Sequence, residues 1–193
     1  MTGTPPQLTL RTSRTFIKKL LKSKNLSGQV IIPGDKSISH SSIILSSVAE
    51  GTSEISGFLK SEDCLATINA FKKMGVKIED EGKKIYVHGV GLHGLKKPVE
   101  DLDLGNSGTS MRLLAGLLSG QKFSSNLIGD SSLSSRPMKR ILEPLKEMGA
   151  FIFSKENTAP LSIKASKKLS GISYELPIAS AQVKSCICLL YTS

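Results

Sequence analysis

Cationic side chains stand beside turns of small residues in this sequence. Lys36 lies within the run Gly34-Asp-Lys-Ser, and Arg136 precedes Pro137 where a helix is predicted to start. Lysine offers a mobile point charge, whereas the planar guanidinium of arginine grips a phosphate or a carboxylate with two parallel hydrogen bonds. Each cation alone fits a solvated surface charge equally well. Together they predict a site for small anionic molecules.

Three turns of small residues each lead into an apolar, helix-like run. They are Gly34-Asp-Lys-Ser, Gly105-Asn-Ser-Gly-Thr-Ser and Pro177-Ile-Ala-Ser-Ala-Gln. The free N–H groups and the positive dipole end of a helix attract anions, and hydroxyl groups add hydrogen-bond donors. For any one turn, ordinary helix capping is the better interpretation. Three such starts at equivalent places of a repeat favour one shared anion pocket.

Other chemistries find less support. A Walker phosphate loop is excluded because no glycine stands five residues before Gly34. Three histidines lack the paired spacing of metal ligands: His40, His88 and His93. Cys186-x-Cys188 has no second pair, and Cys64 falls on the apolar side of a predicted helix. We therefore expect no metal, and we expect Cys64 in the core rather than as a nucleophile.

A repeat of about 70 residues positions these turns. Residues 64–75 (CLATINAFKKMG) align with residues 138–149 (MKRILEPLKEMG), and both show apolar helical spacing before a glycine. Each copy has the order strand, helix, strand, helix, strand, strand, and a third copy begins near Pro177. Strands are predicted over residues 54–58, 76–79, 84–87, 125–128, 150–153 and 160–163.

Composition narrows the function further. Of 193 residues, 39% are hydrophobic, and the net charge is +10. Residues 1–34 hold six basic and no acidic groups, and the other 159 hold 20 basic and 16 acidic groups, so the body is only mildly basic. Without Trp, and with few other aromatics, nucleic-acid binding is disfavoured. No apolar run reaches the ~20 residues of a membrane span, and the odd cysteine count favours the cytoplasm.

Five blocks of the sequence resemble the 5-enolpyruvylshikimate-3-phosphate synthase family, in the family's order. The blocks are IPGDKSISH (32–40), AEGTSEISGFLKSEDCLATINAFKKMGV (49–76), LGNSGTSMRLLAGLLSGQ (104–121), GDSSLSSRPMKRILEPLKEMGA (129–150) and LPIASAQVKS (176–185). The resemblance implies an α/β fold of two domains, each with three βαβαββ units around a pseudo-threefold axis. It implies transfer of the enolpyruvyl group of phosphoenolpyruvate to the 5-hydroxyl of shikimate 3-phosphate. Phosphate is released through a tetrahedral intermediate, with no metal or organic cofactor.

The resemblance also assigns roles to individual residues. Lys36 is expected at the reacting centre, in contact with both substrates. Contacts to shikimate 3-phosphate are expected from Ser37, Ser41, Ser180, Ala181 and Gln182. Contacts to phosphoenolpyruvate are expected from Gly108, Arg136 and Gln182. Glycine rather than alanine at position 108 predicts a site that glyphosate can occupy.

Position 41 departs from the family pattern. The family's first turn reads K-S-x-S-x-R, whereas this chain has Ser41 in place of the arginine that pairs with the shikimate carboxylate. Loss of such a charge-assisted hydrogen bond costs about 1.5–3 kcal/mol. We therefore expect weaker binding of shikimate 3-phosphate than in a member with arginine there.

The domain organisation follows from the same resemblance. We expect a basic extension over residues 1–25, disordered or, as an alternative, an organelle-targeting segment. Residues 26–34 are expected to form a strand and crossover of the other domain, and residues 35–187 an incomplete substrate-binding domain. Residues 188–193 depart from the family and are interpreted as a foreign tail. The family's acid–base carboxylates lie in the other half, so we expect this chain to be inactive alone and the full-length protein to be monomeric.

Two alternatives stay open. The related transferase that acts on UDP-N-acetylglucosamine has a Lys-Asn pair where this chain has Lys36-Ser37, and it uses a cysteine loop absent here. A non-catalytic basic binding module is the other alternative. Steeply salt-dependent binding to nucleic acid would favour the module.

Overall fold

The computed structural model describes residues 8–11, 17–20, 27–165 and 169–191. The chain divides into two units, Met1–Ile32 and Pro33–Ser193. In the first unit, β1 (Leu8–Arg11) pairs antiparallel with β2 (Ile17–Leu20). That residues 1–25 form a disordered or targeting extension stays a prediction. The rest of residues 1–25 lies outside the described residues.

The strand expected over residues 26–34 is absent from described residues 27–34. Val30, Ile31 and Ile32 are 83%, 96% and 82% exposed, although their type favours a strand. A strand needs a neighbour to satisfy its N–H and C=O groups, and no described strand pairs with this segment. Whether the segment belongs to another domain stays a prediction.

The first repeat follows in the order α1, β3, α2, β4, β5. These elements span Lys36–Val48, Glu50–Ser56, Glu62–Lys73, Lys77–Asp80 and Lys84–Val90. Both helices begin at capping side chains, because Asp35 accepts from the N–H of Ile38 and Ser61 accepts from that of Cys64. The three strands form an antiparallel sheet in the order β3-β5-β4.

The second repeat has the same plan with two additions. Its elements are β6 (Leu102–Asp103), α3 (Gly108–Ser119), β7 (Ser125–Ile128), α4 (Ser131–Ser134), α5 (Lys139–Glu147), β8 (Phe151–Ser154) and β9 (Leu161–Lys164). The sheet order is β6-β7-β9-β8, in which β7-β9-β8 reproduces β3-β5-β4 of the first repeat. Helix α6 (Ala181–Tyr191) then begins as predicted after Pro177. The repeat deduced from the sequence is therefore present in the structure, except that described residues 27–35 hold no strand before α1 in the first copy.

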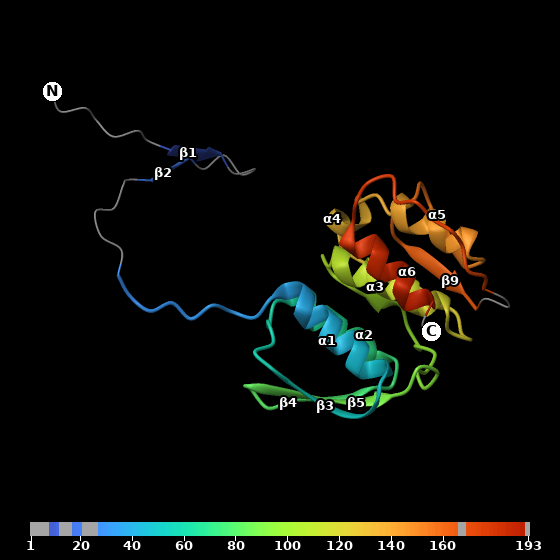
Figure 1. Cartoon of the computed structure of the whole chain (residues 1–193), viewed down its shortest axis with the longest axis horizontal. Coiled ribbons are helices and arrows are strands. Elements are labelled where there is room, and N and C mark those ends of the chain that lie inside the picture. The colour runs from blue at the N-terminus through green and yellow to red at the C-terminus, as the bar shows by residue number, and fades with distance from the viewer. Residues whose placement is uncertain (1–7, 12–16, 21–26, 166–168, 192–193) are drawn as a thin grey trace. The chain divides into compact units, whose positions relative to one another are not determined.

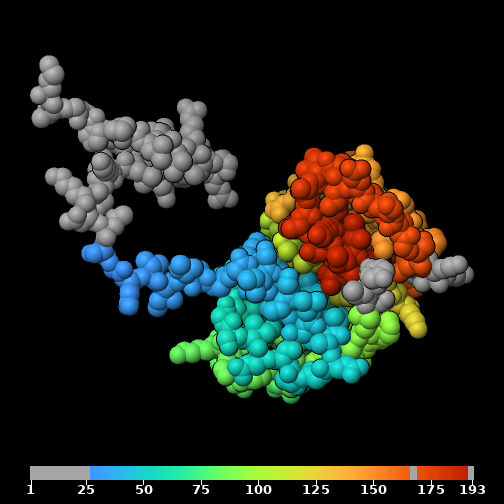
Figure 2. Space-filling view, viewed as in Figure 1, coloured from blue at the N-terminus to red at the C-terminus, as the bar shows by residue number. Residues whose placement is uncertain are grey.

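Three helices form the centre of the second unit (Figure 1). Helix α3 lies between α1 and α6 and is buried along nearly its whole length. Helix α2 packs on α1 and α3, and α5 packs on α3 and α6. No described helix covers α1 and α6 together, and a groove of about 300 Å³ lies between them, lined by Ser41, Ile44, Leu45, Leu113, Lys184, Ser185, Cys188 and Leu189. Figure 2 shows α6 exposed beside α1 on this face.

Candidate anion-binding site

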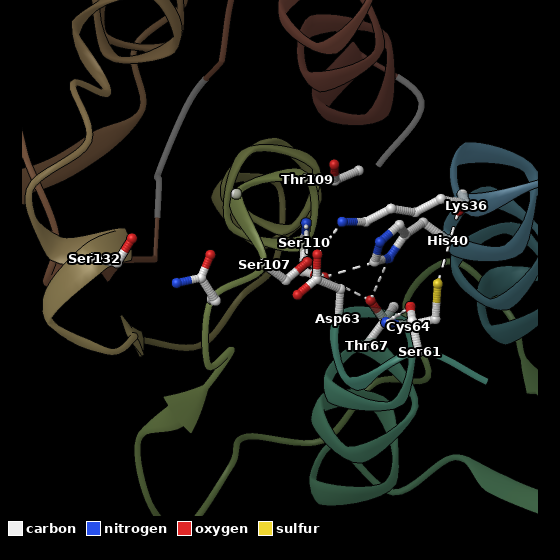
Figure 3. Close-up of polar contacts among 12 residues, drawn as sticks. Lys36, His40, Ser61, Asp63, Cys64, Thr67, Ser107, Thr109, Ser110 and Ser132 are labelled. Atoms are coloured by element: carbon white, nitrogen blue, oxygen red, sulfur yellow. Dashed lines mark hydrogen bonds and ion pairs between the residues drawn. The ribbon is translucent and has the colours of Figure 1, made fainter. Parts of the chain in front are cut away.

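The start of α1 is fixed by a close backbone contact. A side chain at Gly34 would place its Cβ 1.9 Å from the carbonyl oxygen of Gly57, so only glycine fits. Lys36, in the first turn of α1, forms an ion pair with Asp63 of α2. The Lys36 side chain is 49% exposed and extends toward the start of α3 (Figure 3). The lysine is thus held in place while its ammonium group stays reachable by a ligand.

A buried chain of polar groups lies behind Lys36. His40 Nδ1 is 2.7 Å from Thr67 Oγ1, which is 2.6 Å from Ser110 Oγ. Ser110 Oγ is in turn 2.6 Å from Ser107 Oγ (Figure 3). These side chains come from α1, α2 and α3, so the chain of hydrogen bonds joins the starts of α1 and α3. Burial, reinforced by the charge of Lys36 and opposed by Asp63, lowers the pKa of His40, so its imidazole is neutral at pH 7.

The start of α3 lies beside Arg136. Both Nη1 and Nη2 of Arg136 donate to Asn106, the first to its backbone carbonyl at 3.2 Å and the second to its side-chain oxygen. Asn106 Nδ2 donates to Asp130 Oδ2 at 2.8 Å. This bond and the backbone N–H of Leu133 hold the pKa of Asp130 below its usual value. Arg136 is thereby held over the α3 turn while its guanidinium keeps free donors.

A second arginine flanks the same turn. A methyl group at Gly108 would lie 2.8 Å from Arg112 Nη1 and 3.1 Å from Arg136 Nη1. Arg112 Nη1 donates to the Gly108 carbonyl and to Gln182 Oε1, both at 3.1 Å. Gln182 Nε2 donates to Thr109 Oγ1 at 3.0 Å, which ties α6 to α3. Burial, together with nearby Arg136 and Arg140, lowers the pKa of Arg112.

The remaining expected site residues lie at the starts of α1 and α6. Ser180 caps α6, because its Oγ accepts from the N–H of Val183 at 3.4 Å. Ala181 and Ser37 are exposed in the first turns of their helices. Ser41 is also exposed and shares the groove between α1 and α6 with Lys184. These three exposed residues thus flank the site at helix starts and along the groove.

In the structure, hydrogen bonds therefore link the start of α3 to α1 on one side and to the start of α6 on the other. His40 and Ser110 join α1 to α3, and Gln182 and Thr109 join α6 to α3. Sequence reasoning named the turn that contains Asn106 but gave this residue no role of its own, and it missed Asp63 and Arg112 as parts of the site. The available signal for Arg112 was its place four residues after Gly108, one helical turn on the same face. For Asp63 the sequence offered no signal beyond ordinary polarity.

Two of the cysteines are buried side chains. Cys64 is fully buried, as expected, and burial raises its pKa. Burial likewise raises the pKa of Cys186 to about 12. Among residues the structure describes, no three His, Cys, Asp or Glu side chains gather as metal ligands would. Nor is any described helix long and apolar enough to cross a membrane.

Comparison with known proteins places this chain in a family. The family model for EPSP synthase (3-phosphoshikimate 1-carboxyvinyltransferase) matches residues 20–192. A protein of that name from Methylococcus capsulatus is 60% identical over 167 residues, which are 85% of this chain and 38% of that protein. A second, from Ruthia magnifica, is 58% identical over 86% of this chain and 38% of its own length.

A solved structure agrees with the sequence relatives. The EPSP synthase of Acinetobacter baumannii superposes with a TM-score of 0.81 at 55% identity, over 84% of this chain and 37% of that one. The chain thus spans about two fifths of the length of the relatives that it matches. The expected α/β architecture is confirmed for this part. On this evidence, the chain belongs to the EPSP synthase family.

Proposed function

We propose that this chain supplies one wall of a site that transfers the enolpyruvyl group of phosphoenolpyruvate to the 5-hydroxyl of shikimate 3-phosphate. The observation that carries the proposal is the meeting of three helix starts around α3, with Lys36 and Arg136 beside them. Both substrates carry several negative charges, which such a site attracts. The membership of the EPSP synthase family supports the same reaction.

Each residue has a distinct part in the proposed reaction. The 5-hydroxyl oxygen adds to C2 of phosphoenolpyruvate while a proton is added to C3, and the C–O bond to phosphate then breaks as C3 loses a proton. Arg136 and the N–H groups at the start of α3 bind the phosphate or carboxylate of phosphoenolpyruvate. Lys36 lies between the two substrates and stabilises negative charge on the leaving phosphate. Gln182 lies between the two ligands, and Ser37, Ser180 and Ala181 bind shikimate 3-phosphate.

Ser41 weakens the expected binding of the carboxylate of shikimate 3-phosphate. A serine hydroxyl donates a single neutral hydrogen bond, whereas arginine donates two charge-assisted bonds to a carboxylate. Lys184 lines the same groove as Ser41 but comes from the opposite helix. We therefore expect measurable but weakened binding of shikimate 3-phosphate. We further expect the whole protein to be a cytoplasmic monomer that binds no nucleic acid.

The test is ligand binding by the chain itself. Isothermal titration with shikimate 3-phosphate, and then with phosphoenolpyruvate, should give saturable binding. Arg136→Gln should weaken phosphoenolpyruvate binding by about tenfold or more, because a charge-assisted bond is lost. Lys146→Gln, which removes an exposed charge from the last turn of α5, is the matched control. Absence of saturable binding of both ligands would refute the proposal.

The two alternative functions give different results in the same experiment. Stronger binding of UDP-N-acetylglucosamine than of shikimate 3-phosphate would favour the related transferase. Binding to a DNA or RNA oligonucleotide that weakens steeply with salt, without binding of either small substrate, would favour the basic binding module.

A further inference from the structure

Three arginines gather near the starts of α3, α5 and α6, and none of them pairs with a carboxylate of the described part of the chain. They are Arg112 on α3, Arg136 just before α5 and Arg140 on α5. Within the described residues, every ion pair is made by a lysine or a histidine and none by these arginines. Burial, and after it the charges of Arg136 and Arg140, lower the pKa of Arg112, so like charges lie close to the Arg112 guanidinium. An anion bound among them would relieve the repulsion between these charges.

Arg112 separates two spaces in which an anion can lie. Over Gly108 its Nη1 faces that of Arg136, and this space belongs to the site proposed above for phosphoenolpyruvate. The other space is a pocket of about 470 Å³ between α3, α5 and the start of α6. Arg136 does not line this pocket, whereas Arg112 and Arg140 do. The two spaces thus share one arginine and have one arginine each to themselves.

The lining of the pocket suits a phosphate group. Its polar side chains belong to Arg112, Lys139, Arg140, Ser180 and Gln182, and no carboxylate lines it. The apolar floor consists of Pro137, Met138, Ile141 and Val183. Lys139 Nζ lies 3.5 Å from a carboxylate oxygen of Glu143, one turn later on α5. Both side chains are exposed, so this ion pair is weak and Lys139 can bind a phosphate group instead. Two guanidinium groups, an ammonium group and a hydroxyl match a tetrahedral dianion in charge and in donor number.

We propose that this pocket is a second anion-binding site, which takes a phosphate group beside the two proposed substrates. It lies beyond the contacts proposed above and shares only Ser180 and Gln182 with them. The Gln182 side chain lies between the second site and the proposed substrate site. Its amide oxygen accepts from Arg112, and its amide nitrogen donates to Thr109. Both free inorganic phosphate and a phosphate monoester present this chemistry.

The test is titration of inorganic phosphate against the chain, followed by calorimetry and by phosphorus NMR. Arg140→Gln should weaken phosphate binding by about threefold to tenfold, since one partly screened charge-assisted bond is lost. Lys139→Gln should weaken it in the same direction. Lys146→Gln on the same helix has the same charge change outside the pocket and should leave binding as it is. Arg140 is exposed, so its loss should not unfold the chain, which a thermal unfolding curve checks.

Measuring phosphate binding in the Arg136→Gln variant distinguishes this site from the proposed substrate site. In Arg136→Gln, phosphate should still bind, and the further change Arg140→Gln should still weaken it. If the chain binds neither phosphoenolpyruvate nor shikimate 3-phosphate but retains this response, the proposed function fails and the second site stands. Phosphate binding that is absent, or unchanged by Arg140→Gln, would overturn the second site.

The source of the phosphate group is settled by comparing two probes. Equal weakening of inorganic phosphate and of glycerol 3-phosphate by Arg140→Gln supports recognition of the phosphate group itself. Weakening for inorganic phosphate alone supports a site for free phosphate, the product that the proposed reaction releases. Weakening for shikimate 3-phosphate without any change for inorganic phosphate would overturn the proposal and assign Arg140 to the substrate site.

Discussion

Gly108 has no Cβ atom, and this leaves room for the guanidinium groups of Arg112 and Arg136 beside it. The guanidinium groups of Arg112 and Arg136 approach this residue so closely that a methyl group would lie within 3.1 Å of each. Contacts this short force the neighbouring groups to move by a few tenths of an ångström. The sequence placed Gly108 in a turn of small residues expected to bind an anion, and the family resemblance assigned it to phosphoenolpyruvate. Its physical role depends on Arg112, which the sequence showed only as a charge within an apolar run.

Gly108→Ala should therefore weaken the binding of phosphoenolpyruvate and of glyphosate without unfolding the chain. The displaced ends are flexible arginine side chains, so the backbone can stay in place. We expect a loss of about threefold to tenfold in affinity for phosphoenolpyruvate, which corresponds to roughly one weakened charge-assisted bond. Calorimetric titration measures the loss. Gly171→Ala is the control, because a methyl group there meets nothing within 4 Å; equal affinities for the two variants would contradict the steric argument.

Ser41→Arg should strengthen the binding of shikimate 3-phosphate. Ser41 is exposed beside a groove of about 300 Å³, so a longer side chain has room. The added charge-assisted bond to the ligand carboxylate should raise affinity by about tenfold or more. The control ligand is phosphoenolpyruvate, whose affinity should change much less. Unchanged affinity for shikimate 3-phosphate would mean that the carboxylate lies elsewhere.

At the scale of elements, the repeat was predictable because its helices carry strong apolar spacing and glycine stops. The strand β7 was predicted with its observed bounds, whereas β3 begins four residues earlier than expected. The run Glu50-Gly51-Thr52 has no apolar alternation, and it is held as a strand by pairing with β5, where Glu50 lies opposite Val90. Pairing partners are tertiary information, which local pattern does not contain. The short helix α4 was missed, and β6 was expected from the order of the repeat but without bounds, because two to four residues are too few to show a period.

The buried contact of α1, α2 and α3 should make stability depend on pH. The pKa of His40 is lowered in the folded chain, so the unfolded chain binds more protons as the pH falls below about 6.5. Its contribution to stability is therefore complete above that pH and is lost progressively as the pH falls. His40→Gln should flatten this part of the pH profile, measured by urea unfolding between pH 5 and pH 8. His93→Gln is the control, and an equally steep profile for His40→Gln would assign the effect to other groups.

The groove between α1 and α6 is a second consequence of the repeat. Helix α2 covers the junction of α1 with α3, and α5 covers that of α3 with α6, so the α1–α6 junction alone lacks an outer helix among the described elements. Leu45 on this face is 57% exposed, and Ile38 is 70% exposed. Apolar surface of this kind binds hydrophobic dyes and promotes association.

Leu45→Ser should reduce dye binding while leaving the free energy of unfolding within about 0.5 kcal/mol of its original value, because an exposed side chain loses few contacts. The measurements are fluorescence of a bound naphthalene sulfonate dye and urea unfolding. Leu114→Ala is the contrasting variant, since Leu114 is fully buried in α3 and its truncation should cost about 2–5 kcal/mol. Dye binding unaffected by Leu45→Ser would show that the groove is not the exposed apolar surface.

At the scale of the whole molecule, the distribution of acids and bases limits what this chain can do alone. Three carboxylates near the helix starts have partners: Asp35 caps α1, Asp63 pairs with Lys36, and Asp130 accepts from Asn106 and from the N–H of Leu133. The bonds from Asn106 and from the N–H of Leu133 stabilise the charged form of Asp130 and lower its pKa. A carboxyl group whose pKa is lowered is a poor general acid, so we expect Asp130 not to protonate C3 in the proposed reaction. By the family resemblance the acid–base carboxylates lie in the other half of the protein, and we expect the proton to be supplied there.

The chain alone should therefore bind ligands without turning them over. Incubation with phosphoenolpyruvate and shikimate 3-phosphate should release no inorganic phosphate above the background of a Lys36→Gln variant. Binding in the same samples, followed by calorimetry, should still be weakened by Arg136→Gln, since the cations that attract the substrates belong to this chain. Phosphate release that Lys36→Gln abolishes would show that the residues of this chain suffice for the chemistry. In that case one of the three carboxylates, Asp63 first because it touches Lys36, would have to exchange its partner and carry the proton.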